Sequence, residues 1–97
     1  MIRKSYSKTR TVCKVTFAVP SNGEIETIAL CGDFNEWNSE SHIMKRKKNG
    51  DYSATLSLKP GHYRFKYLID ESLWENEKAA DAYTQNAFGT QDSIIKI

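Results

Sequence analysis

The sequence lacks the features that define several large classes of protein. It has no apolar run near the roughly 18 residues of a membrane helix, and no apolar stretch follows the basic residues at its start, as a secretory signal requires. Two separated histidines and two cysteines are too few for a zinc site. A net charge of +2 is too small to require a polyanionic partner. We therefore expect a cytoplasmic protein with no metal, cofactor, membrane or nucleic acid bound.

The two cysteines are not expected to form a disulfide. Side chains alternate between the two faces of a strand, which places Cys13 on the same face as Val15 and Cys31 opposite Leu30. If both apolar sets face the core, the two sulfurs point to opposite sides and cannot bridge. Free thiols fit a reducing compartment.

The usual motifs of catalysis are also missing. There is no Gly-rich phosphate loop, nucleophile elbow or histidine-centred triad. A pair of carboxylates could form a glycosidase site, but turn propensity and solubility explain acids in or beside loops more simply. These acids are Asp33, Asp70, Glu71, Glu75, Glu77, Asp81 and Asp92. We predict that the protein is not an enzyme.

What the sequence does contain is a series of short alternating stretches separated by turns. Its 97 residues, 39% hydrophobic and 27% charged, suit one ordered domain. Residues 1–10 predict a basic arm or edge strand, and residues 11–97 a single antiparallel β-sandwich of about seven to eight strands. Residues 70–87 are expected to be irregular, with at most one helical turn. The expected strands cover residues 11–19, 25–31, 52–58, 63–69 and 93–97. A further short strand is expected to start at residues 43–44 and to end in the basic run at residues 45–48.

The stretch from Leu30 to Asn38 is the most informative part of the chain. It predicts the end of a buried strand followed by a tight polar loop that carries two aromatic rings. Phe34 is expected to plug the end of the core, whereas Trp37 is expected near solvent, and Trp74 lies in a second loop. Exposed rings can stack on bases, on pyranose sugars or on partner proteins. The residues alone therefore indicate a binding module whose ligand stays open.

Residues 30–37, Leu-Cys-Gly-Asp-Phe-Asn-Glu-Trp, resemble the Gly-(Asp/Ser)-Phe-Asn-x-Trp motif of family-48 carbohydrate-binding modules. That family includes the glycogen-binding domain of AMP-activated protein kinase β subunits and the early-set domain of isoamylases. The likeness continues in order through Pro60-Gly61-His62-Tyr63 and Phe88-Gly89-Thr90, and covers nearly all of residues 12–97. It implies an immunoglobulin-like, early-set sandwich that binds an α-glucan such as glycogen or maltodextrin. A module of this kind without further domains is most similar to small, free-standing bacterial early-set proteins.

The resemblance also implies a set of sugar-binding residues. Two of them, Trp37 and Trp74, would stack on glucose rings, and Phe88 would shape the platform. The hydrogen-bonding positions of the family fall on Lys66, Thr90 and Asp92. The chain departs from the family in two places: the turn before Trp74 is one residue longer and lacks the usual glycine, and Asp92 replaces an amide.

A second interpretation remains open beside the first. The basic, β-prone residues 1–10 could add to the sheet edge of a partner protein or of another copy, which would make the sandwich a protein-interaction or self-association module. An enzyme of glycogen metabolism is one possible protein partner. The run Lys45-Arg46-Lys47-Lys48 could instead bind a polyanion, in which case salt would weaken binding strongly.

Overall fold

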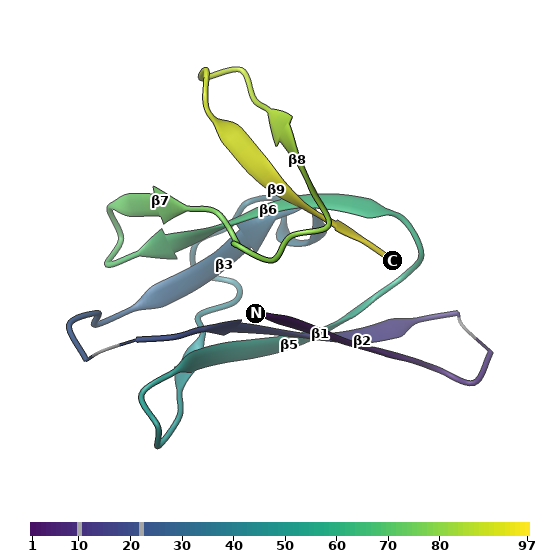
Figure 1. The fold of residues 1–97 in the computed structure, drawn as a ribbon, viewed down its shortest axis with the longest axis horizontal. Helices are drawn as coiled ribbons and strands as arrows, with labels where there is room; N and C mark the ends of the chain where they lie inside the picture. Colours follow the sequence, from purple (N-terminus) through teal and green to yellow (C-terminus); the bar gives the residue numbers. More distant parts are fainter. Residues whose placement is uncertain (10, 22) are drawn as a thin grey trace.

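A computed structural model describes residues 1–9, 11–21 and 23–97 of the chain. Arg10 of the predicted basic arm and Asn22, which forms with Gly23 an Asn-Gly pair typical of turns, lie outside the described residues. The described part contains nine strands in two antiparallel sheets that pack face to face (Figure 1). The predicted all-β sandwich is thus confirmed. No helix in the described part is long and apolar enough to cross a membrane.

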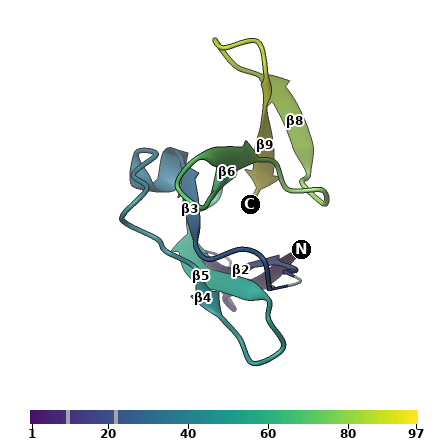
Figure 2. The same cartoon turned by 90° about the vertical axis from the view of Figure 1, so that its left-hand side faces the viewer.

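The first sheet, sheet A, has four strands in the order β1-β2-β5-β4. Sheet B has the order β3-β6-β9-β8, and β7 pairs with the second half of β6. The bounds in sheet A are β1 (Ile2–Tyr6), β2 (Cys13–Val19), β4 (Lys45–Arg46) and β5 (Tyr52–Leu58). Those in sheet B are β3 (Ile28–Gly32), β6 (His62–Ile69), β7 (Leu73–Glu75), β8 (Ala82–Gln85) and β9 (Gln91–Lys96). The β8–β9 hairpin extends well beyond the rest of the sandwich (Figure 2).

The core lies between the sheets and follows the predicted alternation of apolar residues. Cys13, Val15 and Phe17 of β2 are fully buried against the inner face of sheet B. The rings of Phe17 and Phe65 meet edge-on at 5.2 Å, so each sheet contributes one ring to the centre of the core. Phe34 packs against the same cluster, as predicted, with its ring 5.9 Å from that of Phe17.

Strand β3 differs from a half-buried strand because all five of its residues are buried. Ile28 and Leu30 face the main core, whereas Ala29 and Cys31 form a second small cluster with Leu68 on the other face. The two cysteines are free and lie in different clusters, as their predicted opposite directions require. Burial raises the pKa of the Cys31 thiol.

Two predicted features were wrong. Residues 70–87 are not irregular, because they contain β7 and β8, and these two strands bring the total to nine instead of seven or eight. Both strands are short and lie at a sheet edge. The short strand expected to start at Ile43 starts later: β4 begins at Lys45 and ends at Arg46, within the basic run as predicted, and Ile43 makes only an isolated bridge with Ala29.

Residues 2–6 form the edge strand β1, which pairs in antiparallel fashion with β2 of the same chain. Lys4 points across the sandwich, where its ammonium lies 2.7 Å from a carboxylate oxygen of Asp81 and donates to the carbonyl of Lys96 at 2.9 Å. Partial burial alone would raise the pKa of Asp81, but hydrogen bonds from Lys4 and from the backbone of Lys96 outweigh it and lower that pKa. This link ties the edge of sheet A to sheet B.

Candidate binding site

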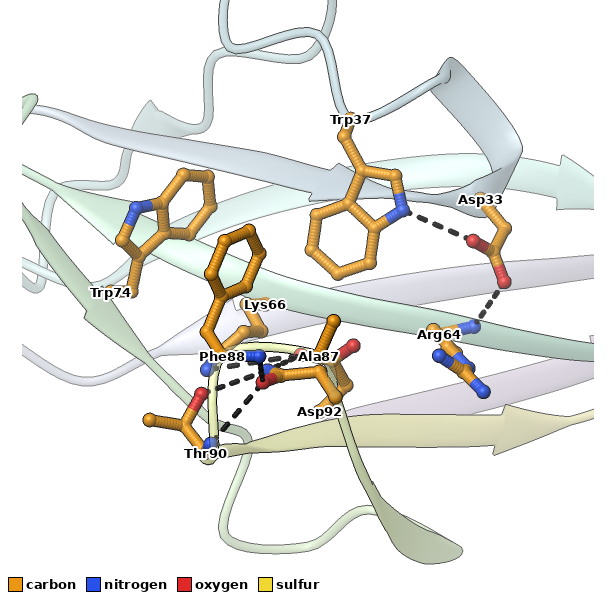
Figure 3. Close-up of a pocket in the computed structure, with 10 residues that line it drawn as sticks. Asp33, Trp37, Arg64, Lys66, Trp74, Ala87, Phe88, Thr90 and Asp92 are labelled. Carbon is orange, nitrogen blue, oxygen red and sulfur yellow. Dashed lines mark hydrogen bonds and ion pairs between the residues drawn. The ribbon is translucent and has the colours of Figure 1, made fainter.

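A hollow of about 830 Å³ lies on the face of sheet B that points away from the core (Figure 3). All six residues that the resemblance implies lie in its wall or floor. The structure adds Asp33, Arg64, Asn86 and Ala87, which the sequence did not single out. The complete lining is Asp33, Trp37, Arg64, Lys66, Trp74, Asn86, Ala87, Phe88, Thr90 and Asp92.

Trp37 is presented by a tight loop at the end of β3. A single 3-10 turn, η1 (Asp33–Asn35), follows the strand, and Glu36 and Trp37 then adopt positive φ values of 56° and 59°. Such a conformation is rare and costly for a bulky residue. It is held by the amide of Trp37, which donates to the carbonyl of Gly32 at 2.9 Å.

Asp33 fixes the indole of Trp37 to the sheet. One of its carboxylate oxygens accepts the indole N–H of Trp37 at 3.0 Å, and the other accepts the backbone N–H of Arg64 in β6 at 2.9 Å (Figure 3). Both oxygens of Asp33 therefore accept hydrogen bonds that position the Trp37 indole. The sequence offered a signal for this role, since Asp33 lies four residues before Trp37 in the same loop.

Asn35 closes the base of this loop from the other side. Its amide donates to the carbonyl of Leu30 at 2.8 Å, while its oxygen accepts the backbone N–H of Gly32 at 3.0 Å. Asn35 also lies 3.0 Å from the ring nitrogen Nδ1 of His42. The Gly-Asp-Phe-Asn-x-Trp motif thus serves mainly to position the indole of Trp37. Its Asp and Asn hold the loop by hydrogen bonds, and its Phe packs in the core.

Trp74 reaches the site through a turn that contains no glycine. Asp70 and Glu71 take positive φ values of 50° and 61°, and the amide of Ser72 donates to the carbonyl of Ile69 at 3.1 Å, as in a type I′ turn. The carboxylate of Asp70 accepts the backbone N–H groups of Glu26 and Thr27 at 2.8 and 3.0 Å, which holds the turn in place. This turn, although it is longer than usual and lacks glycine, therefore places Trp74 at the hollow.

The two indoles meet at the site but do not form one plane. Their ring centroids lie 6.3 Å apart with an interplanar angle of 63°. Trp37 packs on the small cluster of Ala29, Cys31 and Leu68, whereas Trp74 is 45% exposed. Together they form a bent apolar wall, which suits a curved ligand better than a flat one.

The floor of the hollow is a buried charge pair. Lys66 lies on the outward face of β6, but it is only 9% exposed, and its ammonium lies 3.8 Å from Oδ1 of Asp92, which is 6% exposed. The same oxygen of Asp92 accepts a hydrogen bond of 2.9 Å from the amide of Asn86. A buried charge is tolerated when it is paired and hydrogen-bonded. The carboxylate therefore fits at this position, where the resemblance implies an amide.

Asn86 also shapes the third wall, the turn between β8 and β9. Its oxygen accepts the backbone N–H groups of Phe88 and Thr90 at 2.9 and 3.2 Å, and its amide donates to the Thr90 hydroxyl at 2.8 Å. This frame holds the ring of Phe88 over the hollow, where it is 90% exposed (Figure 3). Phe88 thereby adds a third aromatic ring to the apolar wall that Trp37 and Trp74 form.

The chemistry of the lining favours a neutral, hydroxyl-rich ligand with apolar faces. Three aromatic rings form the walls, while the two carboxylates and two cations that line the hollow balance in charge. Asp33 accepts two hydrogen bonds, and Asp92 accepts one from Asn86 and forms an ion pair with Lys66, so neither carboxylate is positioned as a free general base. In the described part of the chain, no three His, Cys, Asp or Glu residues gather to hold a metal ion.

Comparison with known proteins adds independent support for this kind of ligand. The model of the family described as the glycogen recognition site of AMP-activated protein kinase matches residues 14–97. The protein FLOURY ENDOSPERM 6, chloroplastic, of Oryza sativa subsp. japonica is 31% identical over 94 residues, which are 97% of this chain and 16% of that protein.

Two further relatives match smaller parts of the chain. The 5′-AMP-activated protein kinase subunit beta of Schizosaccharomyces pombe is 35% identical over 49 residues, which are 50% of this chain and 15% of that protein. Protein PTST homolog 2, chloroplastic, of Arabidopsis thaliana is 29% identical over 68 residues, 70% of this chain and 12% of that protein. The chain thus spans about a sixth or less of each relative. These relatives are from plants and a fission yeast, so they do not support the bacterial resemblance.

Proposed function

This chain belongs to the family of glycogen-recognition domains of AMP-activated protein kinase, and from that premise we propose that it binds an α-glucan, such as glycogen or maltodextrin, without catalysis. The observation that carries the proposal is the meeting of two indoles from separate loops, 6.3 Å apart, above a polar floor. A pyranose ring has apolar faces and a polar rim. The indoles can stack on the apolar faces, and the polar floor can form hydrogen bonds with the rim.

Each residue of the hollow has a distinct role in this proposal. Trp37 and Trp74 stack on successive glucose rings, and the angle of 63° between them follows the curvature of an α-linked chain. Phe88 covers the ligand from the hairpin tip. Lys66 donates to sugar hydroxyls, and Asp92 accepts from them, as the acceptor that replaces the usual amide.

The polar rim completes this set of contacts. The Thr90 hydroxyl is exposed and already accepts from Asn86, which leaves its own proton free to donate to a sugar oxygen. Asp33 contributes indirectly, because it orients the indole of Trp37.

The affinity that such a site supports is modest. Each stacked ring contributes on the order of 1 kcal/mol beyond its buried area, and the buried Lys66–Asp92 pair gives up part of its own interaction when it accepts new partners. A single site of this size then binds at about micromolar affinity or more weakly.

The deciding experiment is a titration with maltoheptaose or β-cyclodextrin, followed by tryptophan fluorescence. Binding should change the emission of the wild-type protein saturably, and Trp37→Ala or Trp74→Ala should weaken binding about tenfold or more. Leu73→Ser is the matched control, because Leu73 is exposed beside Trp74 but lies on the other face of β7. No spectral change at millimolar sugar would remove the proposal.

Three narrower expectations accompany the proposal and need their own measurements. Incubation with glycogen should release no reducing ends, which tests the absence of catalysis. A cytoplasmic location and association with an enzyme of glycogen metabolism require localisation and pull-down of the full-length protein. Self-association through β1 is the second candidate, because one side of β1 pairs with β2 and its other side is an edge of sheet A. Size-exclusion chromatography with and without residues 1–10 tests it.

A further inference from the structure

Ile43 is an exposed apolar residue that neither the core nor the hollow explains. Its side chain is 59% exposed, yet its backbone is tightly placed at the edge of sheet B. The amide of Leu30 donates to the carbonyl of His42 at 2.9 Å, and the amide of Met44 donates to the carbonyl of Ile28 at 2.8 Å. These two bonds frame Ala29 and Ile43 as a directly opposed pair.

The direction of the Ile43 side chain follows from this pairing. In an antiparallel pair that is not itself hydrogen-bonded, opposed side chains lie on the same face with Cβ atoms about 4.5–5.5 Å apart. Ala29 is opposed to Leu68 of β6, and Leu68 is opposed to Trp74 of β7. Ile43, Ala29, Leu68 and Trp74 therefore form one row across the outer face of sheet B.

Trp37 lies between the two ends of this row. It packs on the cluster of Ala29, Cys31 and Leu68, which includes both central members of the row. Three strand spacings separate Ile43 from Trp74, a span of about 14 Å. An apolar strip thus runs from Trp74 past Trp37 to Ile43, whereas the hollow itself ends at Trp37.

The surroundings of Ile43 resemble those of the other sugar-facing positions. The loop between Trp37 and His42 consists of Asn, Ser, Glu and Ser at residues 38–41, all exposed. An aliphatic contact beside hydroxyl, amide and carboxylate groups can take the apolar face and the polar rim of one more pyranose ring. A single isoleucine bordered by such groups is too small for an apolar protein interface.

We propose that Ile43 forms an additional subsite, beyond Trp37, that contacts one further glucose unit of a bound α-glucan. This inference rests on the proposed function. It makes binding depend on chain length: a short oligosaccharide occupies the hollow alone, while a longer one reaches Ile43 and gains a contact.

The test compares maltotriose with maltoheptaose on the wild-type protein and on Ile43→Ser, by isothermal titration calorimetry or by NMR of the indole N–H signals. The variant should bind maltoheptaose about three- to tenfold more weakly and maltotriose with unchanged affinity. Leu73→Ser removes a side chain of similar exposure, 54%, from the other face and should change neither affinity. Ile43→Trp should strengthen binding of the longer sugar only.

Each other outcome has a definite meaning. Equal weakening for both sugars would show that Ile43 acts by supporting Trp37, and no weakening would show that the ligand does not reach it; either result overturns the subsite. If the wild type binds neither sugar, the proposed function fails together with the subsite. If the wild type binds both sugars and the Ile43 variants bind both with wild-type affinity, the subsite alone fails. Circular dichroism verifies that the variants are folded.

Discussion

Replacing Gly32 with alanine tests the structural role of the loop motif. Gly32 has an extended backbone with φ near −175°, so alanine meets no conformational penalty there. Space is the obstacle: a Cβ atom would lie 2.5 Å from the carbonyl oxygen of Arg64, 2.8 Å from Cβ of Phe65 and 2.9 Å from Cζ of Phe34. Real Cβ contacts stay above about 3.0 Å, so β3 and β6 must separate locally by roughly half an ångström or more.

Overpacking of this kind costs about 1–3 kcal/mol, and we expect the upper end because two of the three obstructing atoms belong to the rigid β6 strand. Urea unfolding should show a loss of about 3 kcal/mol, and the Tm should fall by about 12 °C or more. The matched control is Gly89→Ala, where φ is +80° and nothing lies within 4 Å, so only strain of about 1 kcal/mol is expected. If Gly32→Ala costs no more than Gly89→Ala, the close packing inferred at Gly32 is wrong.

Three further changes probe the loops and the link between the sheets. Asp33→Ala removes the acceptor of the Trp37 indole, so glucan affinity should fall about tenfold and the indole proton should exchange faster in NMR; unchanged exchange would refute this. Because the pKa of Asp81 is lowered in the folded state, its bond to Lys4 stabilises above the ordinary value of 3.8 and is lost as pH falls through the folded value. Denaturation of Asp81→Asn should therefore show a loss of at most about 1 kcal/mol at pH 7, and the loss should become smaller as the pH falls below 3.8. Glu71→Gly relieves a positive φ of 61° and should raise the free energy of unfolding by about 0.5–1 kcal/mol; a loss would contradict the turn assignment.

The sequence predicted those parts of the fold in which one face of a strand is buried. Cys13, Val15 and Phe17 alternate with polar residues, and the structure buries all three. Alternation could not predict that Ala29 and Cys31 are buried too, because the side chain that packs on them, Trp37, belongs to a loop. Nor could it predict β7 and β8, which are short edge strands whose pairing depends on neighbours distant in sequence.

A similar limit applies to the hollow. The resemblance named six residues, and the structure brings them to one place. The resemblance could not indicate which other residues hold these six in position. Asp33 and Asn86 carry out much of the positioning through hydrogen bonds to neighbouring backbone groups, which no spacing rule reveals. The burial of Lys66 was missed for the same reason, since its partner Asp92 is 26 residues away in the sequence.

The hollow is assembled from four parts of the chain, residues 33–37, residues 64–66, Trp74 and residues 86–92, which meet only when sheet B is complete. No single fragment of the chain can carry the site, so the ligand binds the folded chain and not the unfolded one. Binding must then raise the free energy of unfolding, by about 2.7 kcal/mol at a sugar concentration one hundred times the Kd. For a 97-residue domain, that corresponds to a rise in Tm of roughly 11–22 °C. A melting curve measured against a panel of oligosaccharides would thus rank the protein's preferred glucans without any label or activity assay.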